Sequence, residues 1–153
     1  NTEANTVKKR LIEYIWRWNN PWEQIGLNGF EYWTGVYGDG HAQASLIQHF
    51  DKDELHWERT GGNNGGEILT PIVGTVFYPK PMDIDGGYLE IHSRGRDNTP
   101  ERIEAKYNRL VIFDAGNHLH RVTEVTRGVR YAIAINLWQS ELTAVKEGSI
   151  TIE

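Results

Sequence analysis

The chain has 153 residues, of which 39% are hydrophobic and 24% are charged, a balance typical of a folded globular domain rather than a disordered chain. Its net charge of −5 and the lack of a long basic run argue against a nucleic-acid partner, because phosphate binding needs a clustered basic face. The absence of cysteine excludes disulfides and thiolate ligands, and no apolar run approaches the roughly 18–20 residues that cross a bilayer. We therefore expect one domain over residues 1–153 in the cytoplasm, with no membrane span.

The first predicted element is an amphipathic helix over about residues 6–18. Its apolar side chains recur at three- and four-residue spacing, which is the pattern of one helix face. They are Val7, Leu11, Ile15 and Trp18. Asn19-Asn20-Pro21 follows and ends the helix. We expect this helix to pack on one sheet of the β-structure that comes after it.

From residue 30 onward the apolar periodicity changes to two, as in β-strands. Eight segments show it, with Gly, Pro, Asn and Asp between them: residues 30–37, 43–50, 68–78, 88–93, 101–106, 109–115, 120–125 and 129–138. Many short strands separated by turn residues predict a β-sandwich or barrel, with its core over about residues 30–138. The glycine-rich stretch 61–66 lacks the Lys-Ser/Thr of a phosphate loop and is predicted to be a flexible loop.

The stretch QHFDKDELHWE, residues 48–58, contains two His-x-carboxylate pairs. One is His49 with Asp51, and the other is His56 with Glu58. A non-haem iron site uses two His and one carboxylate on one side of the metal, and residues i and i+2 of a strand point to the same side. Either pair could therefore supply two ligands. The third must come from a distant strand, where the candidates are His92, His118 and His120.

The C-terminal part of the chain supplies the context for this choice. In chain order it carries Tyr78, Gly86-Gly87-Tyr88-Leu89, the segment from Arg109 to Phe113, His120-Arg121-Val122 and Arg130. In these elements, within about residues 45–138, the sequence resembles the 2-oxoglutarate- and Fe(II)-dependent oxygenases, particularly the prolyl-4-hydroxylase-like branch. The resemblance implies an all-β core, a double-stranded β-helix or jelly roll, with the metal held between its two sheets. It also implies a need for Fe(II), 2-oxoglutarate and O₂, and it leaves room for ascorbate as a further cofactor.

The same resemblance assigns roles to three residues. His120 matches the distal iron ligand, Arg130 the partner of the far carboxylate of 2-oxoglutarate, and Tyr78 a hydrogen-bond partner of that carboxylate. The last strand agrees, because Arg130 shares a face with two small residues, Ala132 and Ala134, and an inward Arg needs an anionic partner. Ala132 departs from the family, which often has Ser or Thr there. The alternative for Arg130 is a sheet-edge ion pair with a surface Glu.

His49 and Asp51 are preferred over His56 and Glu58 for two reasons. The H-x-D form is usual in the family whereas H-x-E is uncommon, and an apolar strand leads directly into His49, as a rigidly placed ligand requires. The charged segment after Asp51 is predicted to be a loop, so that His56 and Trp57 would lie in a lid and contact the substrate. His118 stays the alternative to His120, and His92 is predicted to be a strand-end histidine.

The resemblance thus implies a dioxygenase that hydroxylates an unactivated C–H bond and releases succinate and CO₂. Its substrate would be a small molecule, a peptide or a protein, with a prolyl or other amino-acid side chain implied by the resemblance alone. Two alternatives remain open. A cupin-like metal enzyme would use no 2-oxoglutarate, although cupins carry an early H-x-H pair and here that pair, at residues 118–120, lies late. A non-catalytic jelly-roll binding module would bind no metal.

Overall fold

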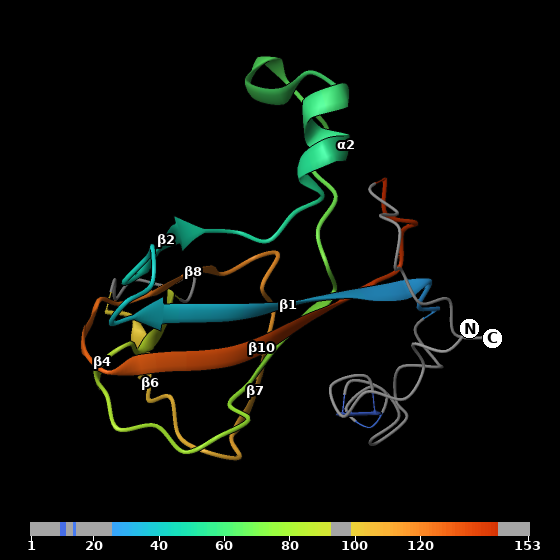
Figure 1. The fold of residues 1–153 in the computed structure, drawn as a ribbon. Helices are drawn as coiled ribbons and strands as arrows, with labels where there is room; N and C mark the ends of the chain where they lie inside the picture. Colours follow the sequence, from blue (N-terminus) through green and yellow to red (C-terminus); the bar gives the residue numbers. More distant parts are fainter. Residues whose placement is uncertain (1–9, 12–13, 15–25, 93–98, 144–153) are drawn as a thin grey trace.

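The computed structural model describes residues 10–11, 14, 26–92 and 99–143 (Figure 1). In chain order the elements are β1 (Gly29–Gly38), β2 (Leu46–His49), α2 (Glu54–Arg59), the 3-10 turn η3 (Gly62–Asn64), β3 (Val73–Phe77), β4 (Asp85–Gly86), β5 (Leu89–His92), β6 (Glu101–Ile103), β7 (Leu110–Phe113), β8 (Leu119–Val122), β9 (Val125–Arg127) and β10 (Val129–Trp138). Among the residues described, no helix is long and apolar enough to cross a membrane.

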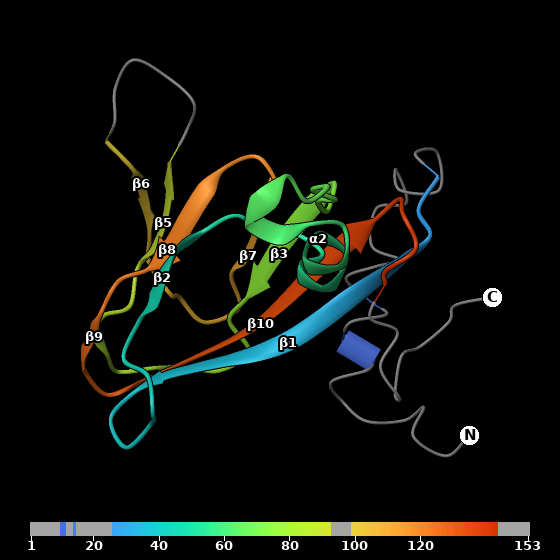
Figure 2. The ribbon, with the colours of Figure 1, turned by 90° about the horizontal axis from the view of Figure 1, so that it is seen from above.

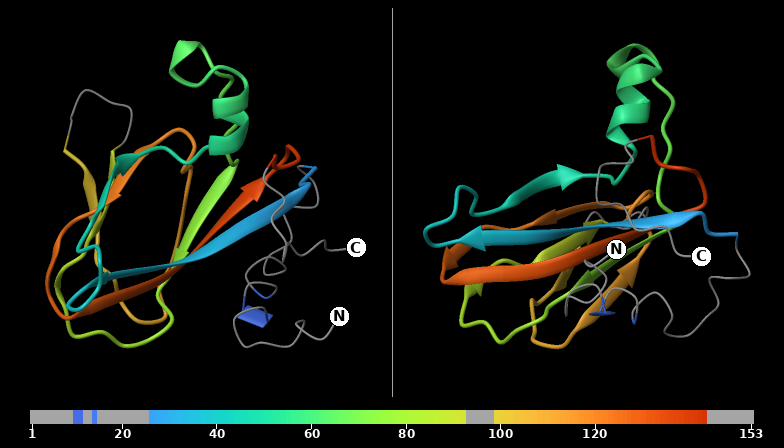
Figure 3. Two further views of the ribbon diagram at one scale, coloured as in Figure 1. Left: turned by 45° about the horizontal axis from the view of Figure 1, so that its top comes forward. Right: turned by 45° about the vertical axis from the view of Figure 1, so that its right-hand side comes forward.

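The strands form two four-stranded antiparallel sheets, with the orders β1-β10-β3-β7 and β2-β8-β5-β6. Figures 2 and 3 show them as two layers, joined at one end by the small β4-β9 pair. Each sheet therefore mixes strands from early and late in the chain. This layered antiparallel arrangement is consistent with the predicted jelly roll.

The long strand β10 is the centre of the first sheet, and its two faces differ as a period of two requires. It pairs along its whole length with β1, from Gly29 opposite Trp138 to Gly38 opposite Val129. One face carries the apolar cluster of Ile133, Ile135 and Leu137. Leu11, from the predicted helix, packs against this cluster, whereas most of that helix lies outside the described residues.

The second sheet contains a buried charge that is paired across the strands. Glu90 of β5 stands opposite Arg102 of β6 and Arg121 of β8 in the strand register. The Nε atoms of the two arginines donate to its carboxylate at 2.6 and 2.5 Å. Because both hydrogen bonds run directly across neighbouring strands, they favour this register over a slipped one.

Three sequence-based expectations are corrected by the structure. The charged segment after Asp51 is not a loop, because Glu54–Arg59 form helix α2, in which the Asp53 carboxylate caps the chain by accepting from the His56 amide. The predicted strand 120–125 is broken into β8 and β9, which pair with different strands: β8 with β2 and β5, and β9 with β4. The predicted strand 68–78 is shorter, from Val73 to Phe77.

Candidate metal centre

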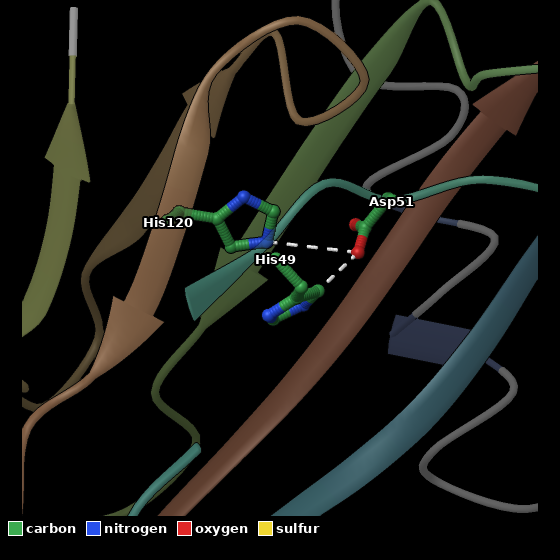
Figure 4. Close-up of side chains that lie close together, drawn as sticks. All are labelled: His49, Asp51 and His120. Atoms are coloured by element: carbon green, nitrogen blue, oxygen red, sulfur yellow. Dashed lines mark ion pairs between the residues drawn. The ribbon is translucent and has the colours of Figure 1, made fainter. Parts of the chain in front are cut away.

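Three side chains meet where β2 ends beside β8. His49 is the last residue of β2 and stands opposite His120 in the strand register. Asp51 follows two residues later, and its amide donates to Ala115 O at 3.1 Å. Its Oδ1 lies 3.3 Å from His49 Nε2 and 3.6 Å from His120 Nε2 (Figure 4). One nitrogen or oxygen atom from each residue lies within 4.8 Å of the others, a spacing that one metal ion can bridge.

Backbone carbonyls decide which nitrogen of each imidazole is available to a metal. His49 Nδ1 lies 2.8 Å from Ile47 O, and His120 Nδ1 lies 2.9 Å from His118 O. A carbonyl oxygen only accepts, so each Nδ1 carries the hydrogen and each neutral ring keeps its lone pair on Nε2. Both Nε2 atoms face a carboxylate oxygen, and only a cation or a proton can stabilise such a group of lone pairs. The donor set therefore fits a divalent metal with carbonyl-oriented histidines.

The carboxylate of Asp51 is held on its other side by the opposite sheet. Asn136 of β10 donates from Nδ2 to Asp51 Oδ2 at 2.8 Å. Burial opposes ionisation of Asp51, but the neighbouring imidazoles of His120 and His49 and the amide of Asn136 outweigh it and hold the pKa of Asp51 well below its usual range. The neighbouring carboxylate of Asp51 also raises the pKa of His49, against the opposing effect of burial. The cluster is thus arranged to keep a negative charge beside a cation.

A cavity between the two sheets joins this triad to a buried arginine. Its lining includes the triad and, from alternate positions of β10, Arg130, Ala132, Ala134 and Asn136. The side chain of Arg130 is 2% exposed, and no carboxylate among the described residues forms an ion pair with it. Leaving a buried cation without a counter-charge is costly, so the cavity favours an anionic ligand. Ala132 and Ala134 provide the space for it.

Tyr78 and Gly87 hold this guanidinium in place. Arg130 Nη2 donates to the Tyr78 hydroxyl at 3.1 Å, and Nε donates to Gly87 O at 3.0 Å. Gly87 has φ +67°, and a Cβ there would lie 3.1 Å from Arg130 Cδ, so a side chain would disturb the arginine. Tyr78 is fully buried and contacts Arg130 rather than lining the cavity itself.

The alternative metal pair is not brought together with a third ligand among the described residues. His56 lies in α2, where Nε2 is 2.9 Å from Glu67 Oε2 and Nδ1 is 3.5 Å from Thr143 Oγ1. Glu58 is exposed, and residues i and i+2 of a helix do not share a face. Neither His56 nor Trp57 is in the cavity lining, so their predicted role as a lid that contacts substrate stays a prediction.

The other histidines lie apart from the triad. His118 Nδ1 is 3.1 Å from Asp114 O, and its side chain borders a separate groove that also contains Ile91 and Ile112. His92 is the last residue of β5, as predicted for a strand-end histidine, and its Nε2 is buried without a hydrogen-bond partner in the described structure.

Sequence reasoning overlooked two residues that contribute to this site. Tyr37 of β1 lines the cavity, with its ring centroid 5.7 Å from the Arg130 guanidinium carbon. The alternation of Trp33, Gly35 and Tyr37 along β1 was the available signal, since all three line the cavity. Asn136 of β10 lines the same cavity as Arg130, but its contact with Asp51 depends on how the two sheets are packed.

Comparisons with known proteins agree with this geometry. The family model of the 2OG-Fe(II) oxygenase superfamily matches residues 32–138. A PKHD-type hydroxylase of Pseudomonas fluorescens is 37% identical over 65 residues, which are 42% of this chain and 27% of that protein. The PKHD-type hydroxylase PiuC of Pseudomonas aeruginosa is 25% identical over 131 residues, 84% of this chain and 53% of the relative.

Two solved structures share the fold. A Pseudomonas putida prolyl-4-hydroxylase aligns with a TM-score of 0.56 at 20% identity, covering 86% of this chain and 60% of its own. A prolyl 4-hydroxylase from Phytophthora capsici aligns with a TM-score of 0.53 at 17% identity, covering 95% of this chain and 44% of its own. The chain spans about a quarter to a half of the length of the two curated relatives described above.

Proposed function

Because the chain belongs to the 2OG-Fe(II) oxygenase superfamily, we propose that it is an Fe(II)- and 2-oxoglutarate-dependent dioxygenase that hydroxylates an unactivated C–H bond. In the balanced reaction, substrate, 2-oxoglutarate and O₂ give the alcohol, succinate and CO₂. The observation that carries the proposal is one cavity that holds both a His-Asp-His cluster and a buried arginine with no counter-ion in the described part of the chain.

Different residues around the cavity would bind the metal and the cosubstrate. His49, Asp51 and His120 would hold Fe(II), since their donor atoms converge. The Nδ1 atoms of the two histidines are hydrogen-bonded to carbonyls, which leaves their Nε2 atoms for the metal. When bound, Fe(II) supplies the O₂ chemistry, which belongs to the cofactor rather than to the protein. Arg130 binds the far carboxylate of 2-oxoglutarate through paired hydrogen bonds, and Tyr78, predicted to hydrogen-bond the same carboxylate, accepts from Arg130 Nη2 and so orients the guanidinium.

The substrate belongs to the same proposal. We infer a prolyl or other amino-acid side chain, free or in a peptide or protein, and two prolyl-4-hydroxylases among the structural neighbours support this class. Three expectations stay predictions beside it: the helix over residues 6–18 packed on one sheet, a cytoplasmic location, and the absence of a nucleic-acid partner. The contact of Leu11 with the apolar cluster of Ile133, Ile135 and Leu137 supports the first of these.

The test is the formation of succinate and CO₂ from 2-oxoglutarate by the purified chain with Fe(II), under air, with and without candidate prolyl peptides. Arg130→Gln should weaken 2-oxoglutarate binding by about 10- to 100-fold, because a charged hydrogen-bonded pair is replaced by a neutral contact. The matched control is Arg127→Gln, which removes an exposed arginine that is bound to Asp83 and Asp85, away from the cavity.

Three results would contradict the proposal in distinguishable ways. Metal binding without any affinity for 2-oxoglutarate would favour the cupin-like enzyme. No metal binding at all would favour the non-catalytic module. Equal 2-oxoglutarate affinity of wild type and Arg130→Gln would remove Arg130 from the cosubstrate site.

A further inference from the structure

Asn136 connects the two sheets at the metal centre. It lies on β10 with 2% of its surface exposed, and its Nδ2 is 2.8 Å from Asp51 Oδ2 and 3.5 Å from Glu31 Oε1. Both neighbours are carboxylates. An ionised carboxylate accepts hydrogen bonds but donates none, so the amide nitrogen of Asn136 must face them. The orientation of the Asn136 side chain is therefore fixed by its partners.

We propose that Asn136 is a positioning residue that presents Asp51 to the metal through a single oxygen. With Oδ2 bound to the amide, Oδ1 is the atom that faces His49 Nε2 and His120 Nε2. A carboxylate held in this way would offer a metal one oxygen rather than two, so that Asp51 would leave room for the cosubstrate and O₂. This inference rests on the proposed function, because it requires a metal at the triad.

Asp51 needs such support because of its place in the chain. It lies beyond the last residue of β2, so the strand ladder ends before it, and the hydrogen bond from its amide to Ala115 O ties its backbone to the sheet region. Its side chain would otherwise be free to turn toward either histidine. The amide from the opposite sheet restricts that rotation.

The surroundings of Asn136 leave it little freedom to move away. A Cβ at Gly74 of β3 would lie 3.1 Å from Asn136 Oδ1 and 2.4 Å from the Ala115 Cβ, so this space accommodates only a glycine. On the other side, Glu31 of β1 stands directly opposite Asn136 in the strand register. The amide is thus enclosed between two neighbouring strands and directed at Asp51.

The experiment compares Co(II) binding and the visible absorption of the Co(II)-loaded protein in wild type and Asn136→Leu. Leucine has a similar size and cannot donate, so Asp51 Oδ2 becomes free. We expect a 10- to 100-fold loss of Co(II) affinity, as is usual for removing a hydrogen bond to a metal ligand, together with a changed Co(II) spectrum. The matched control is Asn117→Leu, which removes an amide that donates to Asp114 in an exposed turn. This control should change neither the Co(II) affinity nor the Co(II) spectrum.

The variant Asn136→Ser, smaller and still polar, is measured in parallel so that the test survives if the leucine variant does not fold. Unchanged Co(II) affinity and an unchanged spectrum in a folded variant would overturn the inference, whatever happens to the melting temperature. Failure of both variants to fold would show a purely structural role and would overturn it as well. If wild type itself binds no Co(II), the proposed metal site fails first, and the inference fails with it.

Discussion

His49, Asp51 and His120 differ in how firmly each is placed, and this difference shapes what each contributes. The two histidines occupy paired strand positions and donate from Nδ1 to carbonyls, so their rings are oriented before any metal arrives. His120 also packs edge-on against Phe113 at a centroid distance of 5.0 Å. Asp51 depends instead on a side chain of the opposite sheet. We therefore expect the histidines to tolerate changes around them better than Asp51 does.

A pair of alanine variants tests the choice between the two late histidines. His120→Ala should abolish metal binding, because it removes one of three converging donors. His118→Ala should keep metal affinity within a few fold, since His118 faces a separate groove and bonds to Asp114 O. Equilibrium dialysis with Mn(II) measures both. Retention of metal by His120→Ala and its loss from His118→Ala would reverse the assignment.

Some residues of the site could be predicted from the sequence. The period of two brought His49 and Asp51 near each other, and the resemblance identified His120, Arg130 and Tyr78. The structure brings these residues to one region, at the cavity between the two sheets. The contribution of Asn136 could not be predicted, because it depends on a contact across the two sheets between positions 85 residues apart.

Helix α2 is a short element that the amino-acid composition of its segment does not predict. The segment from Lys52 is charged and runs into glycines, which indicates a loop. The signal for a helix was its cap, because Asp53 stands directly before Glu54–Arg59 with an acidic first residue and a basic last one. Asp53 is 5% exposed and also accepts from the Thr143 amide at 2.8 Å, so α2 is fixed to the segment after β10.

Removing this cap should destabilise the protein in a pH-dependent way. Burial opposes ionisation of Asp53, but the amides of Thr143 and His56 outweigh it and lower its pKa. A carboxyl with a lowered folded-state pKa stabilises above its unfolded pKa of 3.8, and the stabilisation is lost as pH falls through the folded value. Asp53→Ala should therefore cost about 1 kcal/mol at pH 7 and less near pH 3. Urea unfolding at both pH values measures this.

The control for the cap is Glu54→Ala, the exposed neighbour that begins the helix. Its loss should change the free energy of unfolding by less than about 0.5 kcal/mol, as for most surface positions. An Asp53→Ala variant as stable as wild type at pH 7, or one whose deficit grows on acidification, would contradict the assigned cap.

The site is a property of the whole molecule because each sheet supplies a different part of it. The β2-β8 sheet and the turn after β2 hold the triad, whereas Arg130 and Asn136 come from β10 of the other sheet. A strand pattern of period two predicted the all-β core and most strand positions. It could not predict the strand order, since antiparallel pairing between distant segments leaves no local trace in the sequence.

The most direct measurement of the central claim is the amount of Fe(II) bound per chain under anaerobic conditions in wild type, Asp51→Ala and Glu58→Ala. The assigned triad predicts one Fe(II) per chain in wild type and in Glu58→Ala, and its loss from Asp51→Ala, since Asp51 is the carboxylate between the two imidazoles. Iron that survives the loss of Asp51 but not of Glu58 would place the metal at the other pair, and a wild type without iron would contradict the metal centre itself.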